Sequence, residues 1–320
     1  MVSRMLLLAG ALAAAAAIAA HPAAAASLAP TLMNLRAATA SDGVYTTSTG
    51  ETVHISVSDQ LVPNEAENQA WAEFLASLPH GKELSSVNLY IAPRSEERQL
   101  CGRDALACYY GEAQRIVFPA EDRTSPPSRQ SILAHEYGHQ IERNRLNSPW
   151  PGLVYGTKRW ATYTHVCEDL RSGRMSLNRY ELSPSETFAE SYRMLVEERL
   201  GLDASPWDII DPSLQPDETA LSLIEQDVTD PWSGNTTLAV KGTRTRPVRV
   251  STPLDGKLTM TLRSSGTARW QLKLPGQPGK KAAARGSARS SMTVCGVRTV
   301  TAQVRKLSGR GSFQLAISRP

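Results

Sequence analysis

The net charge and the hydrophobic pattern both change near residue 235. From Thr236 onward the chain has seventeen Lys or Arg and one acidic residue, Asp255, a net charge of +16. Residues 27–235 instead hold seventeen basic and thirty acidic residues. In the basic part, apolar and polar residues alternate between Gly, Ser and Pro turns, as they do in antiparallel strands. The chain is also longer than one core usually organises. We therefore expect two folded parts, the second a small all-β sandwich over 236–320.

The N-terminus has the pattern of an export signal. Arg4 precedes an unbroken apolar run over 5–20, which ends near the small residues 23–26. The run is short and rich in alanine, which favours a signal peptide cleaved after Ala26 over a membrane anchor. The sequence thus predicts a secreted, extracellular protein with no membrane span. Residues 27–50, rich in Ala, Ser and Thr, are expected to form a flexible or pro-like segment.

Four cysteines are expected to form disulfides, because exported chains meet an oxidising compartment. Three pairings are open to them. Cys101 and Cys108 are near enough in sequence to close a small loop, which would leave Cys167 with Cys295. The sequence favours this pairing without excluding the other two.

Strand and helix patterns alternate between residues 51 and 229. Alternating apolar residues predict strands, whereas apolar residues three or four apart predict helices. The aromatic-rich stretch 149–164 shows neither pattern, and residues 230–235 are expected to be a linker. Residues 275–291 are expected to form a long mobile hairpin tip. Strands are predicted at 53–57, 87–91 and 115–118, and helices at 65–78, 128–145, 184–200 and 218–226.

The motif His-Glu-Tyr-Gly-His at 135–139 falls within one of the predicted helices. His135 and His139 are four residues apart and project from one face, so both imidazoles can bind one cation. Glu136 lies about 100° further round, where it can act as base on a water that zinc has acidified. Gly138 costs a helix about 0.5 to 1 kcal/mol relative to Ala, which indicates close packing at that position. The alternative is a surface helix with two solvated histidines.

A catalytic zinc site needs a third protein ligand. A metzincin would place a histidine six residues beyond His139, but Arg145 stands there, so that class is excluded. Glu186 and Glu190 would share one face of the next long helix. The first could bind zinc, while the second accepts the free ring N–H of a ligating histidine.

Other interpretations of these carboxylates stay open. Ser183 and Glu186 have the spacing of a capping box, which needs no metal. Glu190 and Arg193 have the spacing of an ordinary surface ion pair on a helix. His165 is the next candidate for the third ligand, although it lies in a segment of little periodicity.

Together the motifs at 135–139 and 186–190 (Glu-Thr-Phe-Ala-Glu) resemble those of the gluzincin metallopeptidases, most closely the catalytic domain of anthrax lethal factor and its relatives. The resemblance extends over residues 132–195. It implies an α+β zincin-like catalytic domain, a mixed sheet with metal-binding helices, over 51–229. It also implies zinc bound by His135, His139 and Glu186. Glu136 would be the base, and Glu190 would hold a ligating histidine in place. Tyr180 would stabilise the oxyanion, with Tyr163 and Tyr192 as alternative candidates for that role.

The resemblance also implies an extended peptide or protein substrate that pairs with an edge strand. Residues 114–118 are the candidate, although a buried strand would fit the same pattern. The expected function is that of a secreted zinc peptidase. Two alternatives stay open: a zinc amidase acting on peptidoglycan peptides, and a surface-binding protein on a peptidase-like scaffold.

The basic part resembles the β-sandwiches that follow secreted bacterial peptidase domains. Its charge could attract an anionic cell-wall or surface polymer, or could simply complement the acidic part. Trp270 and Phe313 are its only aromatic residues, and it has no known nucleic-acid motif, so no specific nucleic-acid partner is expected. We expect a monomer.

Overall fold

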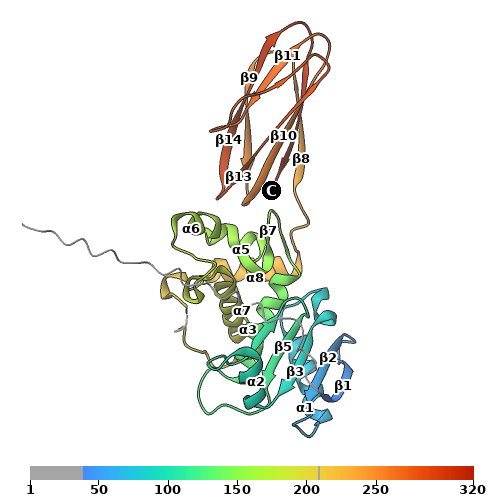
Figure 1. The fold of residues 1–320 in the computed structure, drawn as a ribbon, viewed down its shortest axis with the longest axis vertical. Helices are drawn as coiled ribbons and strands as arrows, with labels where there is room; N and C mark the ends of the chain where they lie inside the picture. Colours follow the sequence, from blue (N-terminus) through green and yellow to red (C-terminus); the bar gives the residue numbers. More distant parts are fainter. Residues whose placement is uncertain (1–38, 208–209) are drawn as a thin grey trace, which may run out of the picture. The chain divides into compact units, whose positions relative to one another are not determined.

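The computed structural model describes residues 39–207 and 210–320 (Figure 1). The predicted signal peptide and residues 27–38 lie outside the described residues. The described residues belong to one compact unit with two hydrophobic cores, one before and one after residue 235. In the described part of the chain, no helix is long and apolar enough to cross a bilayer.

The first core surrounds a mixed five-stranded sheet, in the order β1-β2-β3-β5-β4. The three strands at its centre run parallel, whereas β1 and β4 are antiparallel to their neighbours. This arrangement confirms the mixed α+β class. The strands are β1 (Thr39–Thr46), β2 (Thr52–Ser58), β3 (Asn88–Ala92), β4 (Cys108–Tyr110) and β5 (Arg115–Pro119).

Strand β1 corrects the prediction that all of 27–50 is flexible. It pairs with β2 from Thr39 to Thr46, and the Tyr45 hydroxyl donates to Glu65 at 2.8 Å. Backbone pairing along β2 stabilises β1 without an apolar pattern of its own. Composition alone therefore could not reveal this strand.

Of the two alternatives left open for residues 114–118, the structure shows the buried strand and not the edge strand. Residues 114–118 fall on β5, which lies between β3 and β4 and is therefore internal. The sheet has β1 at one edge and β4 at the other, and β4 is a strand of three residues at the end of the cysteine loop. Its position at the edge follows from tertiary pairing, which the sequence order of the strands does not fix.

The four predicted long helices form, and each begins with a side chain that accepts a backbone N–H. These capping residues are Asn64, Ser128, Ser183 and Asp217. The helices are α1 (Glu65–Ser77), α3 (Arg129–Arg143), α7 (Pro184–Leu200) and α8 (Glu218–Thr229). Shorter helices are α2 (Arg94–Cys101), α4 (Gly152–Tyr155), α5 (Lys158–Tyr163), α6 (Val166–Ser172), η2 (Lys82–Ser86), η3 (Tyr180–Leu182) and η4 (Pro212–Leu214).

Helices α3 and α7 pack directly against each other (Figure 1). A Cβ atom added to Gly138 would lie 2.8 Å from the Cα of Ala189 on α7, a shorter distance than non-bonded contacts of Cβ atoms show. This contact confirms the close packing that Gly138 predicted. The stretch 149–164 differs from its predicted irregularity: β7 (Trp150–Pro151), which pairs with β6 (Leu146–Asn147), is followed by α4 and α5. Helices of four and six residues are too short to show a period.

The second core lies between two four-stranded antiparallel sheets, ordered β13-β10-β15-β8 and β12-β11-β14-β9. The predicted hairpin tip 275–291 instead contains β12 and the start of β13, because these basic residues pair with the apolar strands beside them. The strands are β8 (Thr236–Gly242), β9 (Arg246–Thr252), β10 (Gly256–Ser264), β11 (Arg269–Lys273), β12 (Lys280–Ala282), β13 (Ser287–Val294), β14 (Arg298–Ser308) and β15 (Phe313–Arg319).

Both favoured disulfides form. Cys101 pairs with Cys108, which joins the end of α2 to the start of β4. Cys167 on α6 pairs with Cys295, which follows β13. Two disulfides are compatible with a secreted or extracellular protein.

Candidate metal centre

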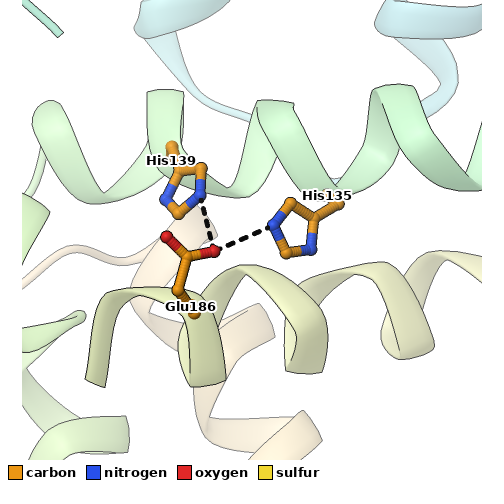
Figure 2. A group of neighbouring side chains, drawn as sticks. All are labelled: His135, His139 and Glu186. Carbon is orange, nitrogen blue, oxygen red and sulfur yellow. Dashed lines mark ion pairs between the residues drawn. The ribbon is translucent and has the colours of Figure 1, made fainter. Parts of the chain in front are cut away.

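Two histidines from α3 and one carboxylate from α7 converge on one point (Figure 2). Glu186 Oε2 lies 3.3 Å from His135 Nε2 and 3.6 Å from His139 Nε2. One ligand atom from each of the three residues lies within 4.8 Å of the others. This group could therefore hold a metal ion.

The local structure decides between two alternatives left open by the sequence. His135 and His139 are only 9% and 8% exposed, which excludes a surface helix with solvated histidines. Ser183 caps α7 by accepting the N–H of Glu186 at 3.4 Å. The carboxylate of Glu186, however, faces the two histidines instead of returning to the cap. Capping accounts for Ser183 but not for the side chain of Glu186.

The other ring nitrogen of His135 faces Glu190. His135 Nδ1 and Glu190 Oε2 are 3.0 Å apart. Arg193 donates to both oxygens of Glu190, at 3.0 and 2.6 Å, and to Glu197 at 2.5 Å. Arg193 is 2% exposed, so the surface ion pair offered as an alternative is wrong. A carboxylate held in this way fixes the orientation of the imidazole and leaves Nε2 available for a metal.

His139 has a comparable partner that the sequence analysis missed. Glu142 Oε2 lies 2.9 Å from His139 Nδ1, and Ser185 Oγ donates to the same oxygen at 2.7 Å. Glu142 is fully buried and lies one turn after His139 on α3. The spacing of three residues was the available signal, but exposed helical pairs have the same spacing.

Burial and opposite charges act against each other in this group. Burial lowers the pKa of His135, but the hydrogen bonds to Glu186 and Glu190 outweigh this effect and raise the pKa to about 9. Burial raises the pKa of Glu186, yet the two histidines bring it well below its usual range. Burial raises the pKa of Glu136 above its usual value, while His135 and His139 oppose that effect. The carboxylates around the two imidazoles therefore favour positive charge at this point, and a bound cation would supply that charge.

The group opens into a cavity of about 640 Å³. Glu136, Tyr180 and two residues of β4, Cys108 and Tyr109, contribute to its walls. Desolvation raises the pKa of Tyr180, and the nearby charge of Glu186 raises it further. Tyr163 donates to Asp217 at 2.6 Å, and buried Tyr192 donates to the carbonyl of Pro79 at 2.5 Å. Of these three tyrosines, Tyr180 lines the cavity in the described part of the chain, and the other two do not.

His165 lies away from the metal-binding group. It precedes α6 with a φ of 58°, and its Nδ1 is 3.0 Å from Glu168 Oε2. The three residues that the structure brings together are His135, His139 and Glu186.

Loss of either supporting carboxylate is expected to weaken metal binding. Glu142→Gln and Glu190→Gln should each lower the affinity for zinc by about 10- to 100-fold, because the ligating imidazole loses its anionic partner. Competition with a chelator of known affinity measures the change. Glu198→Gln, an exposed position on α7, is the control. Equal affinities in all three variants would show that neither carboxylate supports the site.

Comparisons with known proteins identify no family. No family model and no curated protein matches the chain. One similar solved structure is the Aeromonas hydrophila periplasmic inhibitor of g-type lysozyme, with 18% identity over 27% of this chain and 85% of that one, at a TM-score of 0.17. Another is a family GH115 4-O-methyl-α-glucuronidase with specificity for decorated arabinogalactans, with 10% identity over 60% of this chain and 38% of that one, at a TM-score of 0.18. Likenesses this weak carry no argument about fold or function.

Proposed function

We propose that the protein is a secreted zinc-dependent peptidase of the gluzincin type. The observation that carries the proposal is the convergence of His135, His139 and Glu186 beside the buried carboxylate of Glu136 at a cavity wall. Three protein ligands of this kind are typical of catalytic zinc, which keeps a further position for water or substrate. The resemblance of the two motifs to gluzincins supports the same interpretation.

The residues around the cavity have distinct roles in this proposal. Zinc, when bound, supplies the Lewis acidity that makes water a nucleophile near neutral pH. Glu136 takes the proton of the attacking water and delivers it to the leaving amine nitrogen. Tyr180 donates a hydrogen bond to the substrate oxygen as negative charge develops on it. Glu190 and Glu142 keep the two imidazoles in their ligating orientation.

In this proposal, the edge strand β4 binds an extended peptide. No other strand among the described residues pairs with its outer edge, so its backbone groups are available for β-augmentation. Tyr109 on β4 stacks near His139, with ring centroids 6.2 Å apart, and its hydroxyl donates to Gln140 at 2.7 Å. A peptide along β4 would therefore pass beside the metal-binding helix.

Digestion of casein and of purified cell wall, side by side, tests this function. We expect casein cleavage that a chelator abolishes and that added zinc restores. Release of peptidoglycan peptides without casein cleavage would favour the amidase alternative. Inactivity of the zinc-loaded protein on both substrates would contradict the proposed function.

A second candidate function is attachment to an anionic cell-surface polymer. Each outer face of the sandwich has several exposed cations and no exposed acid, because Asp255, the one acid from residue 236 onward, is 2% exposed. Its N–H donates to Thr162 of α5 at 3.0 Å. The exposed cations of one face are Arg249, Arg269, Lys273, Lys281 and Arg305, and those of the other are Lys241, Lys257, Arg263 and Arg289.

Sedimentation with anionic cell walls tests this second candidate in the full chain. Binding should weaken as salt rises, because exposed charges are screened. Lys273→Glu with Arg305→Glu should also weaken it, whereas casein cleavage should be unchanged. Binding that neither salt nor charge reversal alters would contradict an electrostatic attachment.

A further inference from the structure

One wall of the metal cavity is a segment of the chain that lies outside helices and strands. Residues 104–109 all line the cavity, and they join α2, which ends at Cys101, to β4, which begins at Cys108. In the described backbone, residues 102–107 belong to no helix or strand. We call residues 104–108 the cavity rim. Because the rim lacks a continuous ladder of backbone hydrogen bonds, other contacts must hold it in place.

Arg94, the first residue of α2, binds the rim backbone. Its Nη2 donates to the carbonyl of Ala105 at 2.7 Å, and its Nη1 donates to the carbonyl of Leu106 at 3.1 Å. The same Nη1 donates to Glu97 Oε2 at 2.7 Å. Glu97 is fully buried, and its carboxylate forms an ion pair that fixes the position of the guanidinium. A planar guanidinium can satisfy two carbonyls and a carboxylate at once, which an ammonium group cannot do as well.

The Cys101–Cys108 disulfide attaches the far end of the rim to the same helix. Helix α2 is itself fixed to the sheet, because Glu96 accepts from Tyr90 at 2.7 Å and from Ser58 at 2.5 Å. The rim is thus attached to one anchored helix at two points. One attachment is covalent, and the other is a charge-assisted set of hydrogen bonds.

We propose that Arg94 and the Cys101–Cys108 disulfide are positioning elements that hold the cavity rim and the start of β4 where an extended substrate must bind. This inference rests on the proposed peptidase function and deepens it. A rim already ordered in the free protein does not have to be ordered on binding, so more of the contact energy appears as affinity. Arg94 acts on substrate through the rim backbone and takes no part in the chemistry at the metal.

The disulfide adds a consequence for where the peptidase works. Disulfides persist in oxidising compartments and are rare where thiols are kept reduced. The rim is therefore complete only once Cys101 and Cys108 are oxidised. Peptidase activity on extended substrates should be low before export and should rise when this disulfide closes.

Steady-state kinetics on a peptide long enough to pair with β4 tests the proposal. Arg94→Ala and Cys101→Ser/Cys108→Ser should each raise KM by about tenfold, because ordering the rim then opposes binding, while kcat changes less. Arg94→Lys should restore part of the affinity, since one amine can reach one carbonyl. Arg98→Ala, an exposed arginine of α2, and Cys167→Ser/Cys295→Ser are the matched controls.

Hydrogen exchange and metal content separate this inference from the proposed function. Amides of the rim should exchange faster in Arg94→Ala and in Cys101→Ser/Cys108→Ser than in either control, with zinc content unchanged in all variants. Unchanged rim exchange, or an unchanged KM in zinc-loaded Arg94→Ala, would overturn the proposal. A zinc-loaded wild type that cleaves no peptide would overturn the proposed function, and the role of the rim in substrate binding with it.

Discussion

Glu136→Gln is expected to lower kcat for peptide cleavage by about 10²- to 10⁴-fold, the usual contribution of a positioned general base. The amide has nearly the same size as the carboxylate but cannot take the proton of the attacking water. Glu136 is 8% exposed and lines the cavity, so the change falls where the reaction would occur. Initial rates on a fluorogenic peptide, with metal content measured on the same samples, give the comparison.

The matched control for this variant is Glu181→Gln, an exposed carboxylate beside Tyr180. It should keep the wild-type rate. Zinc content should be equal in wild type and in both variants, because neither residue belongs to the converging group of three. Full activity in Glu136→Gln would remove the proposed base and contradict the hydrolytic mechanism.

Arg145→Met is expected to lower the free energy of unfolding by about 3 to 5 kcal/mol, because it leaves a buried carboxylate without its partner. Arg145 Nη1 donates to Glu83 Oε2 at 2.7 Å. Its Nε and Nη2 donate to the carbonyls of Asp227 and Val228 of α8, at 3.0 and 2.9 Å. Arg145 is 9% exposed, so water can replace little of this set. Urea unfolding measures the change.

Two further variants show whether the buried pair causes that loss. Arg143→Met, at the exposed last position of α3 and two residues before Arg145, should change the stability by less than about 0.5 kcal/mol. Glu83→Leu with Arg145→Met should be more stable than Arg145→Met alone, because no unpaired charge then stays buried. If the double variant is as unstable as Arg145→Met alone, the lost stability comes instead from the hydrogen bonds of Arg145 to the carbonyls of Asp227 and Val228.

The long helices could be predicted because their signals are local. The sequence predicted α3 and α7 to within two residues of their ends, and Ser183 was recognised as a possible cap of α7. Strand β1 and the edge position of β4 could not be predicted, because each depends on pairing with a distant strand. A three-residue strand has no usable period, and sequence order does not determine the order of strands in a sheet.

The sequence likewise predicted some residues of the candidate metal centre and missed others. The spacing of the two histidines and the second motif identify His135, His139 and Glu186 as candidate ligands from the sequence alone. Glu142 was missed because a carboxylate three residues after a histidine is equally common on an exposed helix. Arg145 contributed to the sequence argument only by excluding a third histidine, whereas the structure places it in a buried ion pair with Glu83. Burial distinguishes these cases, and burial comes from packing against distant elements.

The metal content of purified wild type and of Glu186→Ala tests the central claim most directly. Glu181→Ala, at an exposed position nearby, is the control. The proposed site predicts about one zinc per chain in wild type and in the control, and a large loss in Glu186→Ala, because two histidines alone do not complete a structural or catalytic zinc site. Wild type without zinc after zinc loading, or undiminished zinc in Glu186→Ala, would contradict a site made of His135, His139 and Glu186.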